Sequence, residues 1–185
     1  MPRSYRIFSE DRYAYFVTCS VVNWLPLFVQ ESYRRIILDS LAYIREHKGT
    51  ELNAFVVMPT HFHAVLWPQE GVNLSNVLRD LKRHTSRSIS REAGRRGDHE
   101  YLHVFASARH GSRARDVSQY QVWQEGSHPE AIFSDDFARQ KIEYIHNNLV
   151  KAELAGKPED WLYSSARAYL SGQQTHPPTD ILSLW

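Results

Sequence analysis

The order of strand and helix patterns along the chain predicts an α+β protein built on an antiparallel sheet. Residues 12–22 alternate as a strand, residues 30–48 carry a helical pattern, and two strand-like runs, 51–58 and 61–67, are separated by two residues. So short a link joins the two runs as a hairpin. With the later elements the order is strand, helix, strand, strand, helix, strand, helix. This order predicts a ferredoxin-like sandwich with its helices packed on one face of the sheet.

The N-terminal elements show both periodicities. In the first strand, Tyr15, Val17 and Cys19 share one face, because alternate residues of a strand point the same way. The helix that follows has an apolar stripe at helical spacing, made by Tyr33, Ile37, Leu41 and Ile44. Gly49 is expected to end this helix.

The elements after the hairpin are less regular. Asn73 is expected to cap a helix that fades by Gly94. Residues 94–119 lack sustained periodicity, which predicts a long, partly mobile loop. Residues 120–124 are expected to form the last strand, and Ser134 to cap the last helix.

Length and composition predict one soluble domain over residues 1–185, with a core at about 12–150 and a C-terminal extension at 151–185. No run is long and apolar enough to cross a membrane, and no apolar signal core follows the N-terminus. Cys19 is the single cysteine, which excludes an intramolecular disulfide and a cysteine zinc cluster. These features favour a cytoplasmic protein.

The net charge is only +1, but the basic residues are unevenly distributed. One segment is crowded with them: Arg79, Lys82, Arg83, Arg87, Arg91, Arg95 and Arg96. A local basic face on a near-neutral protein is typical of a nucleic-acid footprint. The alternative is a helix face that is simply solvated.

Two histidines lie one residue apart in the second strand of the hairpin. His61 and His63 therefore share one face of that strand. Two imidazoles on a rigid strand can hold one metal ion, and an open coordination position could polarise a phosphate. The alternative is an edge-strand histidine pair exposed to water.

The last helix carries a tyrosine and an amide on one face. Tyr144 and Asn148 are four residues apart, and Lys141 precedes Tyr144 by three. If this face meets the histidines, Asn148 completes a set of metal ligands with them, and Tyr144 reaches the bound phosphate as a nucleophile. Spacing alone does not show that the two elements meet. The alternative is a tyrosine at the edge of a core stripe.

Several blocks of the sequence resemble a known family. The sequence of the predicted hairpin, FVVMPTHFH at residues 55–63, resembles the signature sequence of the single-tyrosine transposases with a His-hydrophobic-His motif. The later blocks VWQEG, YIHNNLVKA and PEDWLYSS, at 122–126, 144–152 and 158–165, are similar to the branch called REP-associated tyrosine transposases. The blocks occur in the family's order over nearly the whole chain.

The resemblance implies a ferredoxin-like catalytic domain that nicks and joins single-stranded or hairpin DNA with Mg²⁺ or Mn²⁺. His61, His63 and Asn148 match the metal-binding positions of the family. Tyr144 matches the nucleophile, which leaves a 5′-phosphotyrosine and a free 3′-hydroxyl. The branch favours a monomer over a homodimer. The residues expected to contact DNA are Lys82, Arg83, Arg87 and Lys141.

The sequence also departs from the family pattern, and other functions stay open. Thr60 stands where the family has Asn, and Leu149 stands where it has Pro. The alternatives are a hairpin-binding module without cleavage and a replication or relaxation initiator of the same chemistry. The initiator is disfavoured because the chain lacks a helicase and a second paired tyrosine. Four tryptophans are expected to pack in the core or at its edge rather than to stack on bases: Trp24, Trp67, Trp123 and Trp161.

Overall fold

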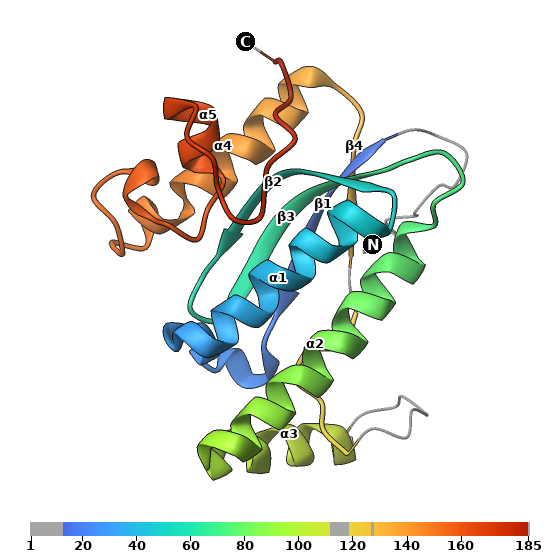
Figure 1. The fold of residues 1–185 in the computed structure, drawn as a ribbon, viewed down its shortest axis with the longest axis vertical. Helices are drawn as coiled ribbons and strands as arrows, with labels where there is room; N and C mark the ends of the chain where they lie inside the picture. The colour runs from blue at the N-terminus through green and yellow to red at the C-terminus, as the bar shows by residue number, and fades with distance from the viewer. Residues whose placement is uncertain (1–12, 112–118, 127, 185) are drawn as a thin grey trace, which may run out of the picture.

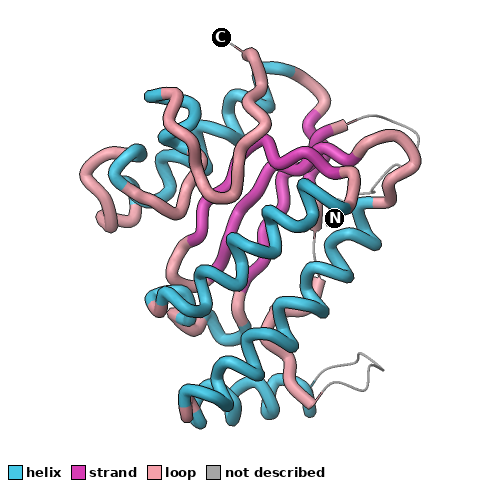
Figure 2. Tube along the Cα trace, in the orientation of Figure 1, coloured by secondary structure: helices cyan, strands magenta, loops and turns pink. Residues whose placement is uncertain are grey.

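A computed structural model describes residues 13–111, 119–126 and 128–184. Its centre is one four-stranded antiparallel sheet in the order β2–β3–β1–β4 (Figures 1 and 2). The strands are β1 Ala14–Ser20, β2 Thr50–Val57, β3 His61–Pro68 and β4 Glu130–Ile132. The predicted α+β, ferredoxin-like architecture is confirmed.

The helices cover both faces of this sheet. Helices α1 (Glu31–His47) and α2 (Leu74–Arg96) pack on one face over the main core, and Figure 1 shows α1 crossing in front of the sheet. Helix α4 (Asp135–Lys151) packs on the opposite face in a second core, against Val56 and Val65. The expectation that the helices lie on one face is therefore corrected. The reason is that β2 and β3 are apolar on both sides, as in any sheet covered twice.

The segment expected to be a long loop contains a helix. Helix α2 does not fade at Gly94 but runs to Arg96, and Gly97 ends it with a positive φ of 75°. Helix α3 follows at His99–Gly111 and buries Phe105 completely in the main core. Its apolar stripe is weak, so packing against the rest of the chain defines it more than its own pattern does. Residues 112–118 lie outside the described residues.

The fourth strand also differs from its prediction. Residues 120–124 make only an isolated bridge, between Trp123 and Val21, whereas β4 pairs with β1. Trp123 is held in the core, where its indole N–H donates to the Thr85 hydroxyl at 2.9 Å. Strand β4 has three residues and no clear alternation, so its pairing with β1 and not its own pattern creates it.

The remaining predictions from composition concern Cys19 and the membrane. Cys19 is free and buried on the main-core face of β1, and burial raises the pKa of its thiol. It is thus a small packing residue and not a reactive nucleophile. Within the described ranges, no helix is both long and apolar enough to span a membrane.

The C-terminal extension covers the free edge of the sheet at β2. The short helices η3 (Pro158–Asp160) and α5 (Ala166–Ser171) flank a segment that bonds to this edge. The Val57 N–H donates to the Tyr163 carbonyl, and the Ser165 N–H donates to the Phe55 carbonyl, both at 2.9 Å. An uncovered edge strand would expose a row of unpaired backbone groups. The division into a core at 12–150 and an extension at 151–185 stays a prediction.

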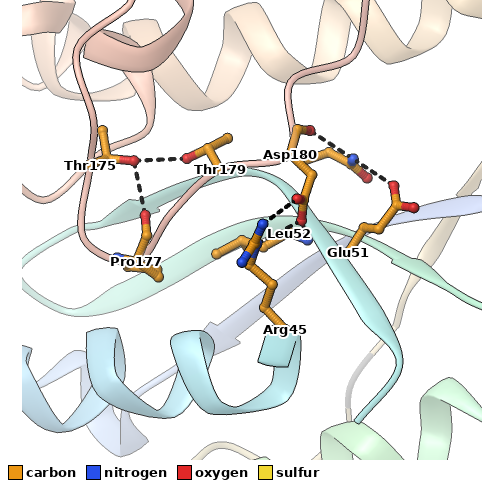
Figure 3. A network of polar contacts seen from close by, with 8 residues as sticks. Arg45, Glu51, Leu52, Thr175, Pro177, Thr179 and Asp180 are labelled. Atoms are coloured by element: carbon orange, nitrogen blue, oxygen red, sulfur yellow. Dashed lines mark hydrogen bonds and ion pairs between the residues drawn. The ribbon is translucent and has the colours of Figure 1, made fainter. Parts of the chain in front are cut away.

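Asp180 fastens the end of the extension to the same strand (Figure 3). Its carboxylate accepts two bonds from Arg45 on α1, at 2.6 and 2.9 Å, and one from the Leu52 N–H at 3.0 Å. Its own N–H donates to the Leu52 carbonyl at 2.9 Å. Bidentate, charge-assisted bonds of this kind are stronger than ordinary surface pairs.

Asp180→Ala should lower the free energy of unfolding by about 2 kcal/mol, because it leaves both Arg45 and the Leu52 N–H without their acceptor. Urea unfolding followed by circular dichroism measures this loss. Asp136→Ala removes an exposed pair with Arg139 and is the matched control, with an expected loss below about 1 kcal/mol. Equal losses in the two variants would show that the bonds of Asp180 stabilise the fold no more than an exposed ion pair does.

Candidate functional site

The two histidines lie on the sheet face that α4 covers, and threonines orient both rings. The register of β1 and β3 places Thr18 opposite His63, and the Thr18 hydroxyl lies 2.8 Å from His63 Nδ1. The Thr60 hydroxyl lies 2.9 Å from His61 Nδ1. The two Nε2 atoms then point at each other, 3.1 Å apart. The sheet and the hairpin turn thus aim both nitrogens at one place.

Burial keeps both histidines neutral. His63 is 5% exposed, and desolvation, followed by the charges of His61 and Lys141, lowers its pKa to about 3. Burial also lowers the pKa of His61. A neutral imidazole whose Nδ1 proton goes to a threonine oxygen leaves its Nε2 lone pair free. At neutral pH both rings can therefore offer a lone pair to the same acceptor.

The donor set fits a divalent metal ion. A separation of 3.1 Å suits two nitrogens that each lie about 2.1 Å from one ion. The threonines occupy the place of the outer hydrogen-bond partners that orient histidines in known metal sites. Across the described ranges, no group of three or more His, Cys, Asp or Glu side chains could hold an ion. Asn148, half-buried one turn after Tyr144, is the amide that the sequence predicts as a third ligand.

Tyr144 lies beside the histidines, as the sequence hypothesis requires. Its ring centre is 5.4 Å from that of His63 and 5.8 Å from that of Phe16, in edge-on contacts. Phe16 in turn stacks on His63 at 5.2 Å. Tyr144 is 41% exposed, so part of the residue is open to solvent. Residue spacing in the sequence could not show whether this helix contacts the hairpin. The structure shows that it does.

Two lysines lie near this tyrosine. Lys141 forms an ion pair with Glu130 of β4 at 2.6 Å and sits 4.5 Å from the centre of the Phe16 ring. A DNA phosphate at Lys141 would therefore compete with Glu130. Lys151 lies 5.9 Å from the Tyr144 ring centre and was not predicted. Its position seven residues after Tyr144, two turns along the same helix face, was the available signal.

The other predicted DNA contacts lie elsewhere. Helix α2 covers the opposite face of the sheet, so Lys82, Arg83 and Arg87 are not brought to the histidines. Arg83 and Arg87 line a cleft of about 670 Å³ between α1 and α2, together with the exposed ring of Tyr43. The predicted basic face and the predicted catalytic site are thus two separate surfaces.

His146 is a buried residue of α4 that the sequence analysis did not single out. Its Nε2 lies 2.9 Å from the Ser165 hydroxyl, which also accepts from the Phe55 N–H at 3.0 Å. This chain of bonds ties the helix that carries Tyr144 to the edge of the sheet through the C-terminal extension. Burial lowers the pKa of His146 to about 4, so the ring is neutral near pH 7.

A family model places the chain among known proteins. The model described as transposase IS200-like matches residues 14–124, which is more than half of the chain. The protein belongs to the IS200-like transposase family. The match includes the histidine pair and ends before Tyr144. No curated protein matches this chain.

Two solved structures are similar to this one. A REP-associated tyrosine transposase bound to a REP hairpin has a TM-score of 0.64 at 19% identity, over 97% of this chain and 98% of that chain. A putative transposase from Deinococcus radiodurans R1 has a TM-score of 0.42 at 18% identity, over 77% of this chain and 94% of that chain. The first shares the fold of nearly the whole molecule.

Acid should destabilise the fold through its buried neutral histidines. The unfolded state binds a proton at His146 below pH 6.5, whereas the folded state excludes it down to about pH 4. Stability is therefore full above pH 6.5 and falls toward pH 4, by at most about 1.4 kcal/mol per pH unit for each such histidine. His146→Gln, which can still bond Ser165, should reduce this slope in urea unfolding at several pH values.

The control for this prediction is His103→Gln, which changes an exposed histidine of α3. Its slope should equal that of the native chain. If His146→Gln also leaves the slope unchanged, His146 does not titrate as its burial requires.

Proposed function

We propose that this transposase nicks and joins single-stranded DNA through a covalent link to Tyr144, with Mg²⁺ or Mn²⁺ held by His61, His63 and Asn148. The observation that carries the proposal is the position of Tyr144. Its ring contacts His63, whose Nε2 atom lies 3.1 Å from the Nε2 atom of His61. A nucleophile and a phosphate-binding position thus lie side by side.

The chemistry is a transesterification at phosphorus. The Tyr144 oxygen attacks the scissile phosphate, the bond from phosphorus to the 3′-oxygen breaks, and the phenol proton is balanced by the proton that the 3′-oxygen takes up. The products are a 5′-phosphotyrosine and a free 3′-hydroxyl. Because one phosphate ester replaces another, the reverse reaction can join a strand without an energy-rich cofactor.

A phenol has a reference pKa of about 10 and is a poor nucleophile at neutral pH without help. A bound divalent ion would supply charge neutralisation at the phosphate and fix its orientation. The chain contributes two preoriented imidazoles, the Asn148 amide and the ring contacts that hold Tyr144 against His63. Histidine and amide ligands also accept Zn²⁺, so the ligand types do not by themselves select the metal.

The proposed substrate is a hairpin from repeat DNA with a single-stranded flank. The structurally similar REP-associated tyrosine transposase is bound to a REP hairpin, and the motifs of the C-terminal half resemble that branch. Arg83 and Arg87, at the cleft between α1 and α2, would contact the DNA backbone away from the proposed catalytic face. In this proposal the protein acts as a cytoplasmic monomer.

A non-catalytic hairpin-binding module is the second candidate, because it needs only the basic face and the fold. A replication or relaxation initiator of the same chemistry is a third. The contact between Tyr144 and the histidine pair favours the enzyme over the binding module, since binding alone does not need a half-exposed tyrosine at that position.

Tyr144→Phe should abolish covalent capture of DNA while leaving hairpin binding intact, because it removes only the nucleophilic oxygen and keeps the packed ring. The native protein with Mn²⁺ and a single-stranded oligonucleotide that carries a REP-type hairpin and its flank should give an adduct that survives denaturing electrophoresis. His63→Ala should lose the adduct as well.

Tyr163→Phe is the matched control, because this hydroxyl bonds Arg34 away from the histidines and its loss should leave the adduct intact. A full adduct yield from Tyr144→Phe would identify a different nucleophile. Tight binding without any adduct from the native protein would favour the binding module.

Reversing the charges of Lys82, Arg83 and Arg87 to Glu should weaken hairpin binding and flatten its salt dependence. Each lost phosphate contact lowers the slope of log K against log salt by about 0.7 to 0.9. Fluorescence anisotropy over a salt series measures both. The same reversal at Arg35, an exposed residue of α1 paired with Glu31, is the control. Unchanged affinity and an unchanged salt slope would show that these residues of α2 do not contact the DNA.

A further inference from the structure

Trp24 is a large exposed aromatic side chain directly beside the histidine pair. It is 56% exposed, and its ring centre lies 5.8 Å from that of His61 at an interplanar angle of 81°. The expectation that Trp24 packs in the core or at its edge is therefore wrong. Trp123, in contrast, is buried as expected. The fold thus leaves an indole in solvent at the edge of the candidate site.

The backbone holds this indole in an uncommon conformation. Asn23 and Trp24, in the turn η1 (Val22–Trp24), both have left-handed φ angles, of 54° and 53°. A bulky residue rarely adopts this region, and such strain concentrates at functional sites. The turn is also firmly attached to the hairpin, because the Trp24 N–H donates to the Val21 carbonyl and the Val21 N–H donates to the Thr60 carbonyl. The backbone that carries the indole is therefore attached to the hairpin beside His61, while the ring itself is exposed.

Trp24 and Tyr144 contact different histidines of the pair. Trp24 contacts His61, Tyr144 contacts His63, and the two histidine rings contact each other at 4.7 Å. In a displacement at phosphorus, the leaving oxygen departs opposite the attacking one. If Tyr144 attacks a phosphate at the histidine pair, the leaving 3′-oxygen and its nucleotide face away from Tyr144, toward the Trp24 side.

We infer that Trp24 is a stacking platform for the base of the nucleotide that carries the leaving 3′-hydroxyl. This inference rests on the proposed function. An exposed indole offers a face on which any base can stack, so the contact tolerates different sequences. It orients the scissile phosphate before cleavage and retains the 3′-hydroxyl end afterwards for the reverse, joining reaction. Trp24 is thus a substrate-positioning residue on the side of the site opposite the nucleophile.

The test uses full-length protein and oligonucleotides that carry a REP-type hairpin with a single-stranded flank. The cut is first located with the native protein from the length of the released 3′-hydroxyl strand. 2-Aminopurine then replaces the base on the 5′ side of the cut or, in a second oligonucleotide, the base on the 3′ side. Binding is measured in the Tyr144→Phe background, so that no cleavage occurs. The 5′-side probe should be quenched on binding, and Trp24→Ala should remove this quenching.

Loss of the stack should weaken binding about 5-fold to 150-fold. Trp24→Phe should retain most of the affinity and quenching, because it keeps an aromatic face. Trp24→Leu keeps apolar bulk without a π-face and should behave like Trp24→Ala. With an active Tyr144, joining should fall more than cleavage, since joining needs the free 3′-hydroxyl end held in place. The control is Leu162→Ala, at a similarly exposed residue of the C-terminal extension, which should resemble the native protein.

Urea unfolding distinguishes this stacking role from a role of Trp24 in stabilising the fold. If Trp24 acts only on DNA, Trp24→Ala should leave the urea midpoint unchanged, because the side chain is exposed. If Trp24→Ala and Trp24→Phe both unfold at lower urea and lose DNA binding together, the ring supports the fold and the inference is overturned.

The experiment distinguishes failure of the Trp24 inference from failure of the proposed function. If the native protein forms the adduct but Trp24→Ala cleaves, joins and quenches the 5′-side probe like the native chain, the function stands and the inference is overturned. If no adduct forms, the probe is scanned along the single-stranded flank. A single position whose quenching depends on Trp24 then supports the stacking site while the cleavage proposal fails.

Discussion

The antiparallel register between β1 and β3 is the constraint on which the site depends. It sets Thr18 directly across from His63 and so gives the buried imidazole a fixed orientation. A shift of one residue would turn both histidines to the main-core face, where Phe62 now packs. The register is strongly determined because both faces of the central strands are buried. The same hydrophobic packing that folds the protein therefore aims the two nitrogens at one point.

The tyrosine is held by a different and more distant set of contacts. Helix α4 packs its apolar stripe on the sheet, and His146 adds a buried bond to Ser165 in the C-terminal extension. That extension covers the β2 edge and is fastened there by Asp180. The extension thus supports the helix that carries Tyr144 as well as protecting an edge strand. Its stability and the placement of Tyr144 are physically connected.

The two departures from the family motif have structural explanations. Thr60 provides the hydroxyl that orients His61, a role that a short polar side chain at this turn can fill. Leu149 is fully buried in the second core, and α4 continues past it to Lys151. A proline there would restrict the preceding residue, Asn148, and favour an earlier helix end. Neither change removes a group that the proposed chemistry uses.

The sequence by itself determined the first three strands of the sheet, their hairpin, the long helices and the shared face of His61 and His63, because side-chain periodicity and capping residues are local signals. It also placed Tyr144 and Asn148 on one helix face. Only the tertiary structure decided that α4 covers the second face of the sheet, that α3 forms within residues 94–119, and that Trp24 remains exposed. These outcomes depend on which surfaces meet across long stretches of chain. A residue's own neighbours in sequence do not contain that information, since packing free energy is shared between distant segments.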